Sequence, residues 1–199
     1  MKQFVRLSII YVLFSLIFIS CGTQKRAVQR VSPDQEIDLS GRWNDTDSKL
    51  AAEALIQQVL GEKWISQFQQ ANNGERPVVI VGLIKNKSHE HISAETFIKD
   101  IEKAIIKNGS VRLVQAGDKR EALRGERADQ QDFASALTTK KWGLELGADF
   151  MMQGTINSIV DTYRDEKVTY YQIDLELSNL ETNEIVWMGD KKIKKYITN

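Results

Sequence analysis

Residues 168–179 read VTYYQIDLELSN, and from Tyr171 onward apolar and polar side chains alternate strictly. The apolar set is Tyr171, Ile173, Leu175 and Leu177, and the polar set is Gln172, Asp174, Glu176 and Ser178. This period of two is that of a β-strand with one face buried and the other in water. We therefore expect a strand over 168–179, half-covered by the rest of the domain.

The chain on either side of this strand predicts an antiparallel meander. Residues 181–184 (ETNE) favour a turn, and the apolar residues of 185–193 predict a strand returning beside the first. Upstream, residues 150–160 predict a third strand.

A strand–helix–strand unit is expected earlier in the chain. Residues 77–84 (PVVIVGLI) form a continuous apolar run, typical of a buried strand. Ser93 is a candidate N-cap for a helix ending at Asn108-Gly109, and a short strand is predicted over 111–115. Two strands joined by a helix favour parallel pairing.

The remaining helices complete an α/β fold. Apolar residues recur near a period of 3.6 over 45–68, with Asp45 or Thr46 as N-cap and Gly61 as a point where the helix breaks. The buried face is expected to comprise Leu50, Ala54, Leu55, Val59, Leu60, Trp64 and Phe68. Residues 118–139 are charged and partly helical, and a short helix is expected over 139–146, ended by Gly147. The predicted fold is a mixed β-sheet sandwiched by helices, in one domain spanning 45–199.

The N-terminal segment has the order of a signal peptide. Lys2 and Arg6 precede a 13-residue stretch, 7–19, that is apolar except for two serines. A spanning helix needs about 20 apolar residues, so this run is short for a permanent anchor. We expect residues 1–20 to be removed.

The next residue is the only cysteine of the chain, Cys21, which excludes an internal disulfide. Phe18-Ile19-Ser20-Cys21 resembles a lipobox, with Phe18 where Leu is commoner. The resemblance implies that Cys21 becomes the N-terminus and carries a thioether-linked diacylglycerol, the only cofactor-like group expected. Two or three acyl chains anchor a protein stably, at about 0.8 kcal/mol per buried CH₂. Gly22, in place of Asp, implies the outer membrane by the enteric sorting rule, with the domain facing the periplasm.

The segment 21–44 is predicted to be a flexible tether, because it is polar and has no apolar period. Residues 22–44 could span at most about 80 Å, and roughly 25–30 Å when relaxed. Trp43 is expected to pack on the domain edge, with partner contact as the alternative. Without 1–20, the chain has 25 positive and 27 negative charges, which predicts no nucleic-acid partner.

Several segments together resemble the LpoB family of penicillin-binding protein activators. They are GRWNDTDS (41–48), PVVIVGLIKNKSHEHI (77–92), RADQQDFAS (127–135), ELGADFMMQGTI (145–156) and LSNLETNEIVWMGDKKIKK (177–195). The resemblance implies a fold similar to the TolB N-terminal domain and to curli-secretion CsgG proteins. It also implies a non-catalytic outer-membrane lipoprotein that activates a bifunctional penicillin-binding protein, a peptidoglycan synthase. This chain lacks the long, Pro-rich tether of the best-known members.

Two polar segments are candidate partner contacts. The first, Asn86–His91, contributes Asn86, Lys87, Ser88, His89 and His91, and the second contributes Arg127, Asp129 and Gln130. The alternative is structural: a loop that caps the following helix, and a solvated helix face on which Asp129 and Asp132 pair with Arg124 and Arg127. A metal site at His89 and His91 lacks a third His or Cys, so none is expected.

No catalytic constellation stands out. The chain has no G-x-S-x-G elbow and no phosphate loop, and a glycan-cleaving carboxylate pair is not recognisable. A CsgG-like secretion ring is the alternative function, although no spare pair of alternating strands is available for a pore, so a monomer is expected. Lys191, Lys192, Lys194 and Lys195 crowd the last strand, either as edge protection or as a contact to an acidic partner or anionic headgroup.

Overall fold

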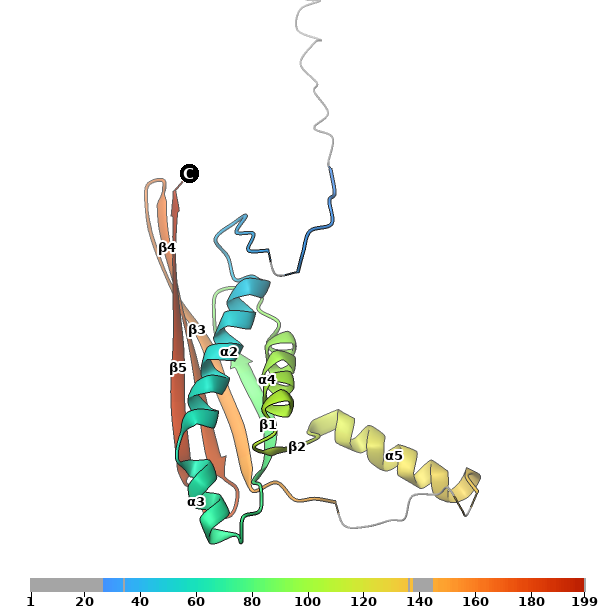
Figure 1. Ribbon diagram of the computed structural model, residues 1–199. Helices are drawn as coiled ribbons and strands as arrows, with labels where there is room; N and C mark the ends of the chain where they lie inside the picture. Colours follow the sequence, from blue (N-terminus) through green and yellow to red (C-terminus); the bar gives the residue numbers. More distant parts are fainter. Residues whose placement is uncertain (1–26, 34, 136, 138–144, 199) are drawn as a thin grey trace, which may run out of the picture. The chain divides into compact units, whose positions relative to one another are not determined.

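The computed structural model describes residues 27–33, 35–135, 137 and 145–198 (Figure 1). The chain divides into two compact units, Met1–Gln35 and Glu36–Asn199. In the described part of the first, the Gln35 amide donates to the Ser32 carbonyl across a turn (3.1 Å). Residues 36–44, which the sequence places in the tether, belong to the same unit as the sheet.

The second unit is built on a five-stranded mixed sheet with the order β2-β1-β3-β4-β5 (Figure 1). β1 pairs in parallel with β2 and β3, whereas β3, β4 and β5 form an antiparallel meander. The parallel β1–β2 pair and the meander confirm the sequence prediction, whereas the parallel β1–β3 pair, which joins the two parts into one sheet, was not predicted. The strands are β1 (Val78–Asn86), β2 (Arg112–Val114), β3 (Phe150–Tyr163), β4 (Glu166–Asn179) and β5 (Ile185–Thr198).

The helix between β1 and β2, α4 (Ala94–Asn108), has the predicted bounds. Its N-cap Ser93 accepts a hydrogen bond from the Thr96 amide at 3.4 Å. Gly109 ends it with a left-handed backbone (φ +74°), a conformation that costs glycine little because it has no Cβ. Local chemistry alone therefore fixed both ends of this helix.

The helix predicted over 45–68 is interrupted at Gly61, as expected: α2 (Asp45–Gly61) is followed by α3 (Trp64–Ala71). The predicted N-caps were wrong. Asn44 caps α2 because its backbone is still extended, and its side chain accepts from the Asp47 amide at 3.0 Å. Asp47 in turn accepts from the Asn44 amide at 2.9 Å, which completes a capping box.

Helices α2 and α4 contact each other and pack on the same face of the sheet (Figure 1). Between them and the sheet lies the core, in which Leu55, Phe97, Ile101 and Ile173 are fully buried. Burying each such side chain contributes about 1.5–3 kcal/mol. Leu50, expected on the buried face of α2, is instead 47% exposed. It lies at the border of that face, whose centre is formed by Ala51, Leu55 and Val59.

Helix α5 (Gly117–Phe133) confirms the helical part of 118–139. It has no buried residue, in keeping with its charged sequence. The helix expected over 139–146 falls largely on residues 138–144, which lie outside the described residues. The structure describes residues 145–148, and they have no regular secondary structure.

Candidate partner-binding surfaces

The loop that follows β1 is organised by the side chain of Asn86. Its Nδ2 donates to the Glu90 carbonyl at 2.8 Å. Its Oδ1 accepts from the amide and the hydroxyl of Ser88, at 2.9 and 2.7 Å. The three hydrogen bonds fold the loop back on itself, so Asn86 serves the shape of the loop rather than its outer surface.

The same loop is fastened to β3. The Lys87 amide donates to the Ile156 carbonyl at 2.8 Å. The His89 amide donates to the Ser158 hydroxyl at 3.0 Å, and the His89 Nδ1 lies 3.0 Å from that hydroxyl. The side chains of Lys87, His89 and His91 remain exposed. The candidate residues of this loop therefore form an ordered polar projection.

Glu90, which sequence reasoning did not single out, points inward from this loop. Its carboxylate accepts from the Trp43 amide at 3.0 Å. Trp43 packs edge-on against Tyr171, with ring centroids 5.4 Å apart, and its indole donates to Ser48 at 3.2 Å. The expected packing of Trp43 on the domain edge is confirmed, and Glu90 is the residue that joins it to the loop.

Tyr171 is fully buried beneath Trp43. Burial, together with the nearby carboxylate of Glu90, raises the pKa of its hydroxyl. Despite that proximity, the hydroxyl makes no hydrogen bond of normal geometry within the described part of the chain. Tyr171 therefore anchors the loop through packing.

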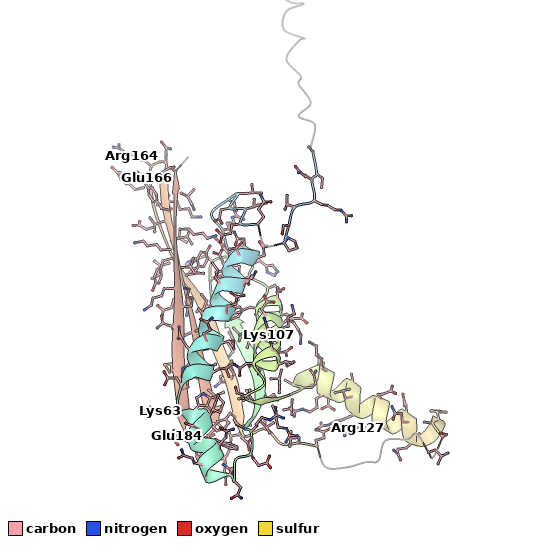
Figure 2. The ribbon with its side chains drawn as sticks, in the orientation of Figure 1. Lys63, Lys107, Arg127, Arg164, Glu166 and Glu184 are labelled. Atoms are coloured by element: carbon pink, nitrogen blue, oxygen red, sulfur yellow. The ribbon has the colours of Figure 1, made fainter. Side chains whose placement is uncertain are left out.

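The second candidate segment lies on α5 (Figure 2). Asp129 is exposed, and the side-chain Nε2 of Gln130 donates to the Glu126 carboxylate at 3.0 Å. Arg127 forms an ion pair with Glu145 rather than with Asp129 or Asp132. The expected pairing of aspartates and arginines along the helix is thus replaced by a bridge to the segment that precedes β3.

Glu145 is held by two arginines. Arg124 binds it in bidentate fashion, at 2.9 and 3.0 Å, and Arg127 contacts the same carboxylate. The hydrogen bond from Arg124, followed by that from Arg127, lowers the Glu145 pKa to about 2. Arg127 and Glu145 border an open groove of about 310 Å³ that is also lined by Leu123 and Leu146.

The two candidate segments do not form one site. The strand β2, which leads directly into α5, pairs with Val78–Ile80 at the beginning of β1. The loop 86–91 follows the other end of β1. Figure 1 shows α5 and this loop in different regions of the unit. A partner that contacts both would have to cover an extended surface.

Sequence reasoning did not identify the uncovered face of the sheet as a surface, although it had assigned Gln172, Asp174 and Glu176 to the wet side of β4. Their side chains form hydrogen bonds across and along the strands: Gln153 of β3 donates to Glu176 at 2.7 Å, and within β4 Gln172 donates to Asp174 at 2.7 Å. A shallow hollow of about 400 Å³ lies on this face, bordered by Lys85 and Met188.

In the part of the chain that the structure describes, no group of three or more His, Cys, Asp or Glu side chains is arranged to hold a metal ion. Within the same residues, no helix has both the length and the apolar character needed to cross a membrane. Cys21 and the apolar stretch 7–19 lie outside the described residues.

These features define a class of protein: a mixed α/β domain that presents ordered polar loops and a polar sheet face. The chain belongs to the LpoB family. The family described as peptidoglycan-synthase activator LpoB matches residues 47–193, and this confirms the resemblance seen in the sequence. The family is one of activators rather than of catalysts.

Solved structures with a similar fold include two LpoB C-terminal domains. The domain from Escherichia coli is 17% identical, with a TM-score of 0.44, over 75% of this chain and 99% of that chain. The domain from Salmonella enterica is 19% identical, with a TM-score of 0.40, over the same shares. Lipoprotein GNA1162 from Neisseria meningitidis is 13% identical, with a TM-score of 0.40, over 60% of this chain and 83% of that chain. No curated protein matches the sequence.

Proposed function

We propose that this chain is a lipid-anchored, non-catalytic activator that binds a bifunctional penicillin-binding protein from the outer membrane. The observation that carries the proposal is the family match over residues 47–193, which runs from the first turn of α2 into β5. In this proposal the domain faces the periplasm.

Activation of this kind needs no chemistry in the activator. It requires the domain to bind the active conformation of the synthase more tightly than the resting one. A tenfold activation corresponds to a preference of about 1.4 kcal/mol. A few side chains on an ordered surface supply that difference.

The loop 86–91 suits such a role because its backbone is already fixed by Asn86 and by β3. A preorganised loop loses little conformational entropy on binding. The exposed side chains of Lys87, His89 and His91 are the proposed contacts here, and Asp129 is the proposed contact on α5.

The test of activation uses the purified mature protein, beginning at Cys21, with its cognate bifunctional synthase. Glycan polymerisation is followed as the protein is titrated. We expect the rate to rise several-fold and to saturate. Saturable binding without any change in rate would reject activation, and absence of binding would reject the partner.

Single substitutions test the contacts. Lys87→Ala, His89→Ala and Asp129→Ala each remove an exposed side chain and leave the hydrogen bonds of the loop backbone in place. We expect each true contact to weaken binding by about 1 kcal/mol or more. Lys107→Ala, an exposed residue on α4 (Figure 2), is the matched control. A residue whose variant binds like the control is not a contact.

Two further experiments test the lipid anchor and the assembly state. Mass spectrometry of protein isolated from outer membranes should find a diacylglycerol-modified Cys21 as the first residue, whereas a free thiol would reject the anchor. On sizing in detergent we expect a monomer. A large ring would favour the secretion alternative.

A further inference from the structure

One end of the sheet extends beyond the rest into a region that we call the hairpin tip. It is formed by residues 159–170 of β3 and β4 and residues 193–198 of β5. Across it, Ile159 pairs with Tyr170, which pairs with Lys194. Val168 pairs with Tyr196 in the same way. Paired residues of a sheet share a face, and residues two apart along a strand share it too. Ile159, Tyr163, Val168, Tyr170 and Tyr196 therefore lie on the uncovered face.

This hairpin tip exposes apolar and aromatic surface. Ile159 and Tyr163 are each 66% exposed, and Tyr196 is 62% exposed. Ile159 pairs with the half-buried Tyr170 and Tyr196 with the half-buried Val168, so exposed apolar side chains are grouped with others on this face. Grouped apolar surface of this kind is typical of an interaction site. Tyrosine is the residue that combines an apolar ring with a polar end, and it is enriched where proteins meet the headgroup layer of membranes.

Charges of both signs surround these rings. Arg164 lies over the Tyr163 ring, 5.1 Å from its centroid, and Lys194 is exposed on the same face. Asp161 and Asp165 are exposed at the same end. Such a mixture is complementary to a surface that itself carries phosphates and ammonium groups, as a layer of phosphatidylethanolamine does.

The chain from the N-terminus joins the domain beside this tip. Asp38 forms an ion pair with Lys195 near the end of β5, at 2.8 Å. Gly41 packs so closely against Ile197 that a Cβ there would overlap it. Between Cys21 and the unit that begins at Glu36 lie residues 22–35. A segment of this length reaches about 50 Å at full extension and about 20 Å when relaxed.

We propose that the hairpin tip rests on the phospholipid headgroups of the bilayer that holds the anchor. The inference deepens the proposed function, because it relies on the acyl chains at Cys21. A second, weak contact next to the anchor would orient the domain. The opposite end, which carries Lys63 and Glu184, would face away from the membrane (Figure 2).

The experiment uses the lipidated full chain in vesicles of phosphatidylethanolamine and phosphatidylglycerol. Lipidation removes the only native thiol, so a cysteine introduced at Asp165 or at Glu184 is a unique labelling site. Each site receives the same fluorophore, and the vesicles contain lipids with nitroxide headgroups. We expect quenching at Asp165→Cys to exceed that at Glu184→Cys by about threefold or more, because headgroup contact holds the tip within roughly 10 Å of the bilayer boundary.

Substitution of the exposed side chains tests whether they cause the quenching at residue 165. Ile159→Ser combined with Tyr196→Ser should lower quenching at residue 165 to the level seen at residue 184. The matched control is Leu83→Ser combined with Met188→Ser, whose residues are 63% and 64% exposed on the same sheet face but away from the tip. The control should leave quenching unchanged. Equal quenching at both labels in the unsubstituted protein would overturn the proposal.

The outcomes separate this inference from the proposed function. A chain without its lipid fails to float with vesicles, so failure of the anchor is seen before any quenching is measured. A chain that contacts lipid but does not activate the synthase keeps the tip inference and rejects activation. If the tip is not quenched and the Ile159/Tyr196 variant loses activation, the tip is a protein-binding surface and the lipid proposal is wrong.

Discussion

The ammonium of Lys195 lies 2.7 Å from the carboxylate of Asp47, and only 12% and 7% of the two side chains are exposed. The same ammonium lies 2.8 Å from Asp38 and donates to the Arg42 carbonyl at 3.1 Å. One lysine thereby connects the end of β5, the first turn of α2 and the chain that leads into the domain.

Loss of this lysine should destabilise the domain. Lys195→Met leaves the Asp47 carboxylate buried without its counter-ion. We expect the free energy of unfolding to fall by about 2–3 kcal/mol, between the values for exposed and fully buried ion pairs. Urea denaturation measures the change. Lys194→Met, one residue away and exposed, should change stability by less than about 0.5 kcal/mol. Equal effects would mean that the ion pair contributes nothing.

The ammonium of Lys195 also predicts that the stability of the domain depends on pH in the alkaline range. Burial opposes the charged form of Lys195, but its hydrogen bonds to Asp38 and Asp47 outweigh burial and raise its pKa above 10.5. A pKa that is higher in the folded state stabilises the fold fully below about 10.5, and the contribution is lost as the pH rises through the folded value. The stability difference between wild type and Lys195→Met should therefore shrink from pH 9 to pH 12. A constant difference over this range would contradict the assignment.

The capping box at the start of α2 gives a local test. Asn44→Ala removes the acceptor for the Asp47 amide and should cost about 1 kcal/mol of stability. Asp45→Ala, at one of the two positions that the sequence predicted as cap, should cost less than about 0.5 kcal/mol, through the helix dipole alone. Thermal denaturation followed by circular dichroism compares the two. A larger loss for Asp45→Ala would show that the cap lies there.

Gly154 in β3 is expected to tolerate no side chain. A Cβ at this position would overlap the backbone carbonyl of Asp174, which cannot move without distorting β4. Gly154→Ala should therefore destabilise the domain by about 2–3 kcal/mol. Gly125 in α5 has open space around it, so Gly125→Ala should be neutral or raise stability by up to about 1 kcal/mol. Denaturation of both variants alongside the wild type checks the contrast.

Much of the candidate site depended on long-range contacts. The sequence located the loop 86–91 and the polar face of β4, because a polar run and a period of two are local signals. It assigned Arg124 and Arg127 to aspartates on their own helix, because partners within one helix are the only ones that a sequence makes visible. Arg124 does pair within α5, but with Glu121. The partner that both arginines share, Glu145, comes from a distant segment, and only the fold brings it to α5.

By itself, the sequence determined the meander, the strand–helix–strand unit and both ends of α4, because alternation, Ser93 and Gly109 act through neighbouring backbone groups. Tertiary structure alone decided which of four similar lysines on β5 is structural. The register of β4 and β5, with α2 packed against β5, turns Lys195 toward Asp47 and leaves Lys194 in water. A lysine's role depends on what the opposite element places within about 3 Å of its ammonium, and that distance exists only once the chain has folded.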